Sequence, residues 1–305
     1  MRLPWRDRHG RFLPLKAVVL AAAFVPGLVY AARWLGDDLG SRPLNEAIHG
    51  TGLWAVRILM ISLAITPFAR MLDWTKLLLV RRIAGVSAMT YGLIHLSLYF
   101  VDQKFALLTI ASEILLRFYL TLGFVALLGL TALGVTSTDA MTRRMGKWWK
   151  RLHRLAYPIG VLALWHYFLQ SKANVSEPVF VAGLFAWLMA WRALPETWRR
   201  GTAVYPVLAV LAGPVTAAIE FAWYGLATRI DPWRVVGASG TLDFGLRPAH
   251  WVFITAATAA AIVAGRRIWT RRAGGITGSP SSGPIPSRTG RASSETPPNR
   301  RAPAV

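Results

Sequence analysis

Apolar stretches alternate with short polar connections over most of this chain, and the alternation predicts its architecture. A helix that crosses the hydrocarbon core of a bilayer needs about 20 predominantly apolar residues. Eight stretches meet or approach that length, and Trp and Tyr, which favour membrane–water interfaces, are frequent at their ends. The predicted spans are residues 17–35, 52–69, 84–101, 118–135, 155–169, 179–193, 203–227 and 251–264. No segment alternates strand and helix, so we predict an all-α, polytopic membrane helix bundle of about eight transmembrane helices.

Composition supports this prediction and removes several kinds of chemistry. The chain of 305 residues is 54% hydrophobic, and only 16% of its residues are charged, against about a quarter in soluble domains. It contains no cysteine, which excludes disulfides, thiolate-ligated haem, iron–sulfur clusters and Cys-based zinc sites within this chain.

The distribution of positive charge predicts orientation. The formal net charge of +21 would suggest nucleic acid as the partner of a soluble protein, but here Lys and Arg lie in short connections between apolar segments. We therefore expect contact with anionic membrane lipids and no nucleic acid. One side of the predicted membrane topology carries 26 Lys and Arg and the other 8, which places both termini in the cytoplasm. Residues after Gly274 lack an apolar period and are predicted to be a disordered basic tail.

Three histidines in apolar surroundings are the main candidates for chemistry. Within residues 141–170 a basic, Trp-rich run leads into an apolar helix, which is predicted to carry His153 near its inner end and His166 near its outer end. His95 lies in the outer half of the third span. Imidazole is a common axial ligand of haem iron, so His95 and His166 are predicted to clamp one iron, with His153 as a ligand nearer the cytoplasm. The alternative is that all three are buried histidines with hydrogen-bond partners.

The spacing of the last two histidines raises a geometric objection. Thirteen residues turn an ideal helix by about 220° beyond whole turns, so His153 and His166 do not share one face. Either Pro158, which lies between them, bends the helix, or the two side chains face different neighbours.

Charged residues within or beside the spans have two interpretations each. Arg57 either snorkels to the headgroups or offers a cation to a haem propionate. Arg81 and Arg82 are either topology charges or ligands for a phosphate of a flavin or lipid. Glu220 looks unpaired within its span, and it either handles protons or pairs with a neighbouring arginine.

A short basic segment is predicted to lie on the inner membrane surface. Residues 136–139 offer capping oxygens, and residues 140–150, rich in Trp and Met, form the predicted surface helix.

Three runs carry a family resemblance. They read LAITPFAR, RRIAGVSAMTYGLIHLSLYF and LGVTSTDAMTRRMGKWWKRLHRLAYPIGVLALWHYF, within residues 50–194. In order and spacing they resemble the MsrQ (YedZ) family, the haem-binding membrane subunits of the bacterial methionine sulfoxide reductase system. That family belongs to the ferric reductase-like transmembrane group, which includes the NADPH oxidases.

The resemblance implies a function and a set of site residues. It implies an electron-transfer subunit with one or two haem b groups and FMN, in which His95, His153 and His166 bind haem and Arg81 and Arg82 contact a flavin or quinone. The implied acceptor is a periplasmic molybdopterin enzyme that reduces methionine sulfoxide in oxidised envelope proteins, and the implied donor is the quinone pool or a cytoplasmic flavin reductase. The implied location is the bacterial inner membrane. The predicted division is a basic tail with the first span (1–49), a ferric reductase-like haem-binding core (50–195), two additional helices (196–272) and a disordered basic tail (273–305).

Three rival functions remain open from the sequence alone. A stand-alone ferric or quinone-linked reductase of the same group would need no periplasmic partner. A proton-coupled transporter would use the histidines and Glu220 as a relay, although no convincing internal repeat is present. A pure membrane anchor would need no buried histidines.

Overall fold

The computed structural model describes residues 5–6, 10–171, 174–241, 243 and 245–276. Within these residues the secondary structure is helical, apart from an isolated bridge between Arg6 and Phe12. The elements are α1 (Pro14–Leu35), α2 (Pro43–Met71), the 3₁₀ helix η1 (Thr75–Val80), α3 (Arg81–Asp102), α4 (Leu107–Leu116), α5 (Phe118–Val135), α6 (Asp139–Met145), α7 (Lys147–His153), α8 (Ala156–Gln170), α9 (Ser176–Ala193), α10 (Glu196–Arg200), α11 (Val204–Ala227), α12 (Pro232–Ser239) and α13 (Pro248–Ile276). Residues up to Arg266 form one compact unit, and residues from Arg267 belong to a second.

The predicted spans correspond to eight of these helices, and the all-α prediction is confirmed. Six stretches in the described residues are long and apolar enough to cross a membrane: α1, α2, η1 with α3, α5, α11 and α13. The other two predicted spans form α8 and α9, of 15 and 18 residues. The chain is therefore a multi-pass membrane protein in which the number of full spans lies close to the predicted eight. The predicted tail from residue 273 lies mostly outside the described residues.

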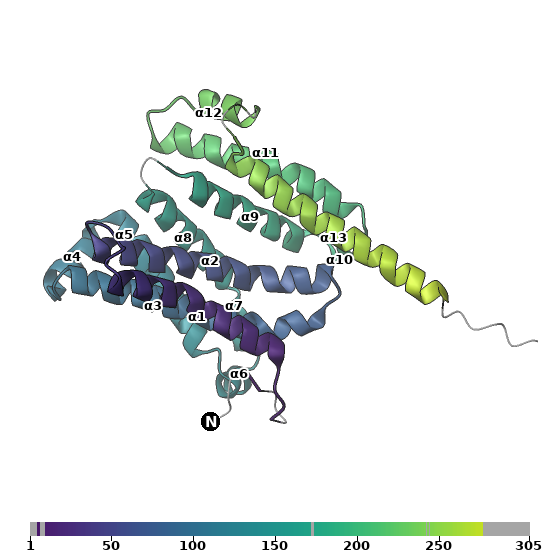
Figure 1. The fold of residues 1–305 in the computed structure, drawn as a ribbon, viewed down its shortest axis with the longest axis horizontal. Helices are drawn as coiled ribbons and strands as arrows, with labels where there is room; N and C mark the ends of the chain where they lie inside the picture. The colour runs from purple at the N-terminus through teal and green to yellow at the C-terminus, as the bar shows by residue number, and fades with distance from the viewer. Residues whose placement is uncertain (1–4, 7–9, 172–173, 242, 244, 277–305) are drawn as a thin grey trace, which may run out of the picture. The chain divides into compact units, whose positions relative to one another are not determined.

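Helix α2 is the centre of the first layer of packing. It packs along α3 and also contacts α1, α8 and α9 (Figure 1). Its buried face contributes Leu59 and Leu63 to an apolar core that includes Ala88 of α3, Leu130 of α5 and Phe185 of α9. This core holds α2, α3, α5 and α8 together around the site described below.

Helices α9, α11 and α13 form a second cluster. Trp187 and Trp191 pack there with Leu208, Val252 and Ala256. Helix α9 therefore joins the two clusters, because it also contacts α2 and α8.

Residues 141–170 contain two helix breaks, and they correct the prediction that one helix carries both His153 and His166. Gly146, between α6 and α7, has a φ of 51°, a conformation that L side chains rarely adopt. A second break separates α7 from α8, and Pro158 lies in the first turn of α8, where its missing N–H has no helical partner to lose. Since His153 and His166 lie on different helices, the objection based on an ideal 13-residue rotation does not apply. The predicted capping is confirmed, because the Thr138 hydroxyl accepts a hydrogen bond from the Met141 N–H at 3.2 Å.

The first helix, α1, has a specific hydrogen-bonding partner in α3. The Tyr91 hydroxyl accepts a hydrogen bond from the Gly27 N–H at 2.8 Å and donates one to the Ala23 carbonyl at 2.8 Å. In a regular helix these two groups pair with each other, so a side chain of α3 takes part in the backbone hydrogen bonding of α1 beside Pro26. A cavity of about 540 Å³ lies beside this contact, between α1, α2 and α3.

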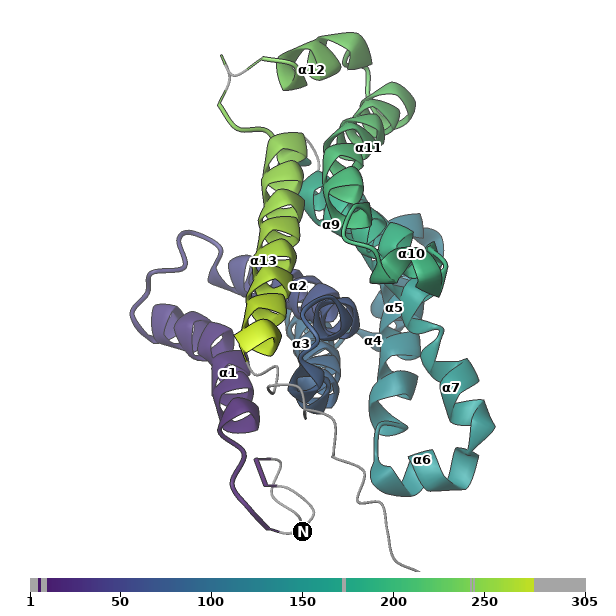
Figure 2. The same cartoon turned by 90° about the vertical axis from the view of Figure 1, so that its right-hand side faces the viewer.

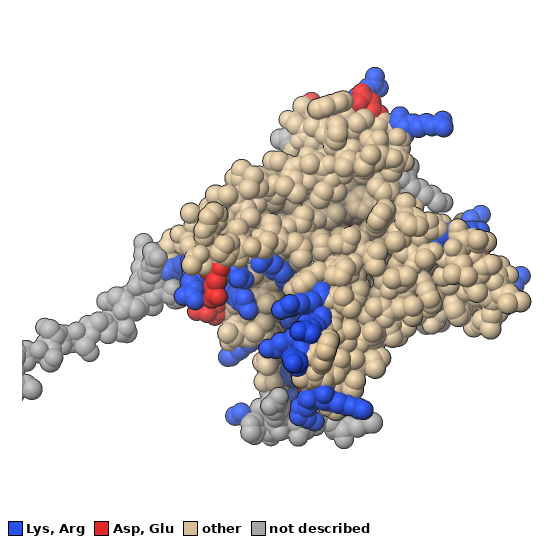
Figure 3. All heavy atoms as spheres, turned by 180° about the vertical axis from the view of Figure 1, so that it is seen from behind, with Lys and Arg blue, Asp and Glu red and all other residues tan. Residues whose placement is uncertain are grey.

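Positive charge marks one end of the helices. Lys and Arg gather in a band over η1, α6, α7 and α10, while most of the rest of the visible face is uncharged (Figure 3). We call these elements the basic end. The opposite end, which we call the mouth end, includes α4, α12 and the connection at residues 36–42. Figure 1 shows α4 and α12 toward the left and α10 toward the right, and Figure 2 shows α12 and α6 at opposite edges of the view.

Candidate functional site

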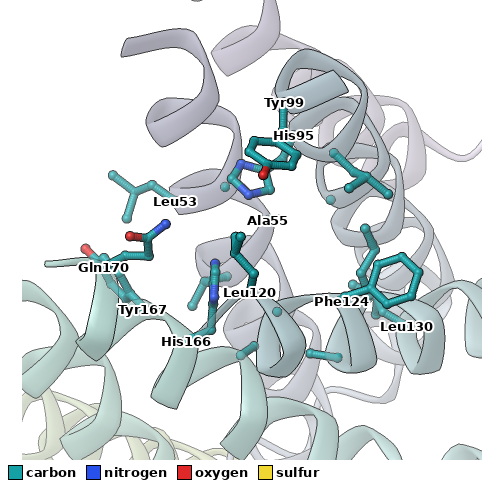
Figure 4. A pocket seen from close by; sticks show the side chains of 18 of the residues that line it. Leu53, Ala55, His95, Tyr99, Leu120, Phe124, Leu130, His166, Tyr167 and Gln170 are labelled. Atoms are coloured by element: carbon teal, nitrogen blue, oxygen red, sulfur yellow. The ribbon is translucent and has the colours of Figure 1, made fainter. Parts of the chain in front are cut away.

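A cavity of about 260 Å³ lies between α2, α3, α5 and α8 (Figure 4). Most of its lining is apolar, including Leu53 and Val56 of α2, Leu127 and Leu130 of α5, and Ala163 of α8. Two of the predicted ligands, His95 and His166, also line it. The cavity is therefore suited to an apolar molecule that two imidazoles can reach.

The imidazoles of His95 and His166 approach one another from opposite sides of the cavity (Figure 4). Their ring centroids are 6.4 Å apart, and the ring planes make an angle of 77°. His95 Nδ1 lies 2.8 Å from the Ile48 carbonyl oxygen, and His166 Nδ1 lies 2.7 Å from the Tyr119 carbonyl oxygen. A carbonyl can only accept a hydrogen bond, so Nδ1 carries the proton in both rings, and Nε2 keeps a lone pair for a ligand.

Two glycines make this arrangement possible, and the sequence prediction missed both. A Cβ atom on Gly52 would lie 2.8 Å from His95 Nδ1, and one on Gly123 would lie 2.7 Å from His166 Nδ1. Gly52 follows Ile48 by four residues, and Gly123 follows Tyr119 by four. In each case the glycine leaves room for the imidazole to reach the carbonyl one turn earlier. A glycine inside an apolar helix is the sequence signal that pointed to such a close approach.

The pair fits a haem iron with two axial imidazoles. Metal–imidazole bonds are about 2 Å long, so a metal held by Nε2 of both rings would place the centroids about 6 Å apart, close to the observed separation. The carbonyl partners of Nδ1 are the kind of support that orients ligating histidines. The described residues contain no group of three or more His, Cys, Asp and Glu able to hold a metal. Two protein ligands therefore suit an ion whose remaining ligands come from a macrocycle.

His153 is placed elsewhere, at the basic end of the molecule. Its ring stacks on Trp149 at 3.8 Å, its Nδ1 lies 3.1 Å from the Trp149 carbonyl, and its Nε2 lies 3.3 Å from the Ser137 hydroxyl. Burial lowers the pKa of His153, and the positive charge of Arg81 acts in the same direction. The structure does not bring His153 to the cavity of His95 and His166, and its role as a metal ligand stays a prediction.

The predicted arginines also have other partners. Arg57 does not line the cavity: its Nε donates to Glu177 Oε1 at 2.8 Å, and its guanidinium lies 5.1 Å from the centre of the Trp54 ring. Arg82 pairs with Asp139 at 2.9 Å on the exposed basic end. A propionate contact for Arg57 and a flavin or quinone contact for the pair at residues 81–82 remain predictions.

Polar residues at the mouth end of the cavity were not predicted. They are His49, Tyr99, Tyr167, Gln170 and Ser171. The Tyr99 hydroxyl donates to Glu113 at 2.6 Å, and Glu113 pairs with Arg117 at 2.7 Å. The sequence analysis assigned no role to His49. It lies three residues before Gly52 and seven before Val56, which places it on the helical face that lines the cavity.

Glu220 is paired, which corrects its unpaired appearance in the sequence and confirms the alternative of an arginine partner. Its carboxylate is 2% exposed, and it accepts a hydrogen bond from Arg247 at 2.6 Å. The Ser239 hydroxyl lies 3.3 Å from the same carboxylate and accepts from Arg247 Nε at 3.0 Å. This network joins α11 to α12 and to the residues before α13.

Comparisons with known proteins identify relatives of this chain. The family model described as the ferric reductase like transmembrane component matches residues 51–164. This range includes His95, Gly52 and Gly123, and it ends two residues before His166. No solved structure gives a significant match.

Curated relatives match a larger part of the chain. A protein-methionine-sulfoxide reductase heme-binding subunit MsrQ from Rhodospirillum rubrum is 41% identical over 203 residues, which cover 66% of this chain and 95% of the relative. A protein of the same name from Xanthomonas euvesicatoria is 40% identical over 194 residues, 61% of this chain and 89% of the relative. One from Xanthomonas campestris is 42% identical over 168 residues, 55% of this chain and 75% of the relative. The chain therefore belongs to the MsrQ family of protein-methionine-sulfoxide reductase heme-binding subunits.

Proposed function

We propose that this protein is the haem-binding membrane subunit of a methionine sulfoxide reductase system, with haem b held between His95 and His166. The observation that carries the proposal is the pair of imidazoles, whose ring centroids are 6.4 Å apart, each with Nδ1 on a backbone carbonyl and a lone pair left on Nε2. The relatives are named as heme-binding subunits of protein-methionine-sulfoxide reductases, so the proposed reaction of the system is the reduction of protein methionine sulfoxide.

The residues of the chain would bind the cofactor and tune its surroundings. Haem supplies reversible one-electron chemistry when bound. His95 and His166 supply two neutral ligands, and the carbonyls of Ile48 and Tyr119 hold both rings in orientation. The apolar lining excludes water from the ligand, and the protein thereby limits side reactions with solvent.

The proposed direction of electron flow rests on the two ends of the molecule. The bias of Lys and Arg supports a cytoplasmic basic end in a bacterial inner membrane, with both termini on that side. The cavity reaches the mouth end, which then faces the periplasm. Electrons would leave there to a periplasmic molybdopterin enzyme that reduces methionine sulfoxide in envelope proteins.

The donor is proposed to act at the basic end. His153 and Arg81 lie close enough for the arginine charge to act on the imidazole, and Trp149 stacks on the same ring. An aromatic face beside positive charge suits a flavin such as FMN, delivered by a cytoplasmic reductase, or a quinone headgroup. A second haem would also be held at this end, by His153.

Absorbance spectroscopy and a coupled assay test the proposal together. The full chain, expressed with ample haem and purified, should show a b-type spectrum after dithionite reduction. His95→Ala and His166→Ala should each lose most of that spectrum. In vesicles, the wild type should deliver electrons to the methionine sulfoxide reductase of the same system, and neither variant should.

A matched change at the other end separates the predicted sites. His153→Ala should keep the spectrum of the pair at His95 and His166 while slowing reduction by a flavin or quinone donor. A colourless wild type would overturn the proposal, as would a His95→Ala variant with an unchanged spectrum.

A further inference from the structure

The cavity has two chemically different ends. Its deep part is lined by apolar side chains, among them Leu59 of α2, Leu130 of α5 and Ile159 of α8. Its polar lining lies at the mouth end, where α2 begins and where α3 and α8 finish. A ligand that is apolar along one edge and acidic along the other would therefore enter in one orientation.

His49 is the basic group at that mouth. It lies in the second turn of α2, one residue after Ile48, whose carbonyl holds His95. Its side chain lines the same cavity as His95 and His166. His49 is therefore close to both predicted ligands from one side of the cavity.

Two arginines on the helices around the cavity mouth are already paired with carboxylates. Arg57 is held by Glu177, and Arg117 is held by Glu113. Within the described part of the chain, no carboxylate forms an ion pair with His49. Imidazole can donate a hydrogen bond to a carboxylate, and a charge-assisted bond of this kind is stronger than a neutral one.

The geometry points to His49 as the residue that holds the acidic edge of the ring ligand at the mouth of the cavity, and this inference rests on the proposed function. The class of ligand is a tetrapyrrole with carboxylate side chains, and haem b is the member that the proposed function requires. His49 acts here as a positioning residue, since the iron ligands are His95 and His166. The sequence had suggested Arg57 for this contact, but the Glu177 pair and the position of Arg57 outside the cavity favour His49.

The experiment compares substitutions in the purified, haem-loaded full chain. His49→Ala should release haem to apomyoglobin about tenfold faster than the wild type, as expected for the loss of one charge-assisted hydrogen bond. The propionate bands of the resonance Raman spectrum should shift, while the bands that report two axial imidazoles should stay. His49→Gln, which keeps an N–H donor, should restore part of the retention.

Two further variants make the result specific. His250→Ala is the matched control, because His250 lies at the start of α13, outside the cavity lining, with its Nδ1 accepting from the Arg247 N–H. It should leave haem release and the propionate bands unchanged. The double variant Arg57→Gln with Glu177→Gln removes the competing cation without changing net charge, and the inference predicts wild-type propionate bands.

The outcomes separate this inference from the proposed function. If the wild type binds haem and His49→Ala retains it with unchanged propionate bands, the assignment of His49 is wrong and the proposed function stands. Shifted bands in the Arg57 and Glu177 double variant, with none in His49→Ala, would assign the contact to Arg57 instead. A wild type without haem would overturn both the inference and the proposed function.

Discussion

The proposed chemistry of this molecule depends on a few residues, and only some of them could be identified from the sequence. His95 and His166 were predicted as a pair because ionisable residues within spans are uncommon, and the structure brings their rings to 6.4 Å. Gly52, Gly123 and His49 were not predicted, because their roles depend on which helical face meets which neighbour. Packing between helices that are distant in sequence decides which faces meet, and the hydropathy pattern does not predict that packing.

The glycines beside the imidazoles should not tolerate a methyl group. In Gly52→Ala or Gly123→Ala, the new Cβ would contact a ring nitrogen at 2.8 or 2.7 Å, so the imidazole must leave its carbonyl. We expect each variant to lose about 1–3 kcal/mol of stability and part of its haem content. Thermal unfolding and the haem-to-protein absorbance ratio measure these effects.

A third glycine provides the control. A Cβ atom on Gly237, in α12, would meet no other atom within 4 Å, so Gly237→Ala should leave haem content unchanged. Normal haem content in both cavity variants would show that the close contacts do not constrain the rings.

At the scale of elements, apolar length was a good guide to where helices lie and a poor guide to where they break. The span predicted over residues 118–135 has the same bounds as α5. The prediction that one helix carries both His153 and His166 was wrong, because a short break before Ala156 separates α7 from α8. A positive φ at Gly146 also divides the surface helix predicted over residues 140–150. A helix break of one or two residues hardly changes a hydrophobic pattern, whereas a predominantly apolar stretch of 18 residues, such as α5, is easy to recognise.

The contact between α3 and α1 predicts the effect of removing one hydroxyl. In Tyr91→Phe the Gly27 N–H and the Ala23 carbonyl lose their shared partner, which should cost about 1–3 kcal/mol unless α1 straightens to pair them directly. We expect a lower unfolding temperature and faster proteolysis of α1. Tyr30→Phe is the control, since the Tyr30 ring of α1 packs beside Gly50 of α2. Equal effects of the two changes would contradict a specific role for the Tyr91 hydroxyl.

For the whole molecule, charge and hydropathy together predicted a multi-pass helical membrane protein, and the family comparison agrees. Sequence alone did not show that Glu220 and Arg247, 27 residues apart, meet in a buried pair. The pair ties α11 to the residues before α13, and its full engagement argues against Glu220 as a free proton carrier in a transporter.

A double-mutant cycle tests this structural role of the pair. Glu220→Gln or Arg247→Gln alone leaves one buried or half-buried charge without its partner, which should cost about 3–5 kcal/mol. The double variant should cost clearly less than the sum of the two single changes, with an unchanged haem spectrum in all three. Reversible unfolding in mixed detergent gives the free energies, and strict additivity would show that the two side chains do not act as a pair.

Electron paramagnetic resonance of the oxidised full chain shows whether His95 and His166 share one haem iron. We expect a low-spin ferric signal typical of two imidazole ligands, which becomes high-spin in both His95→Ala and His166→Ala and stays low-spin in His153→Ala. A low-spin signal that survives either of the first two substitutions, or that is lost only in His153→Ala, would show that the two histidines do not share an iron.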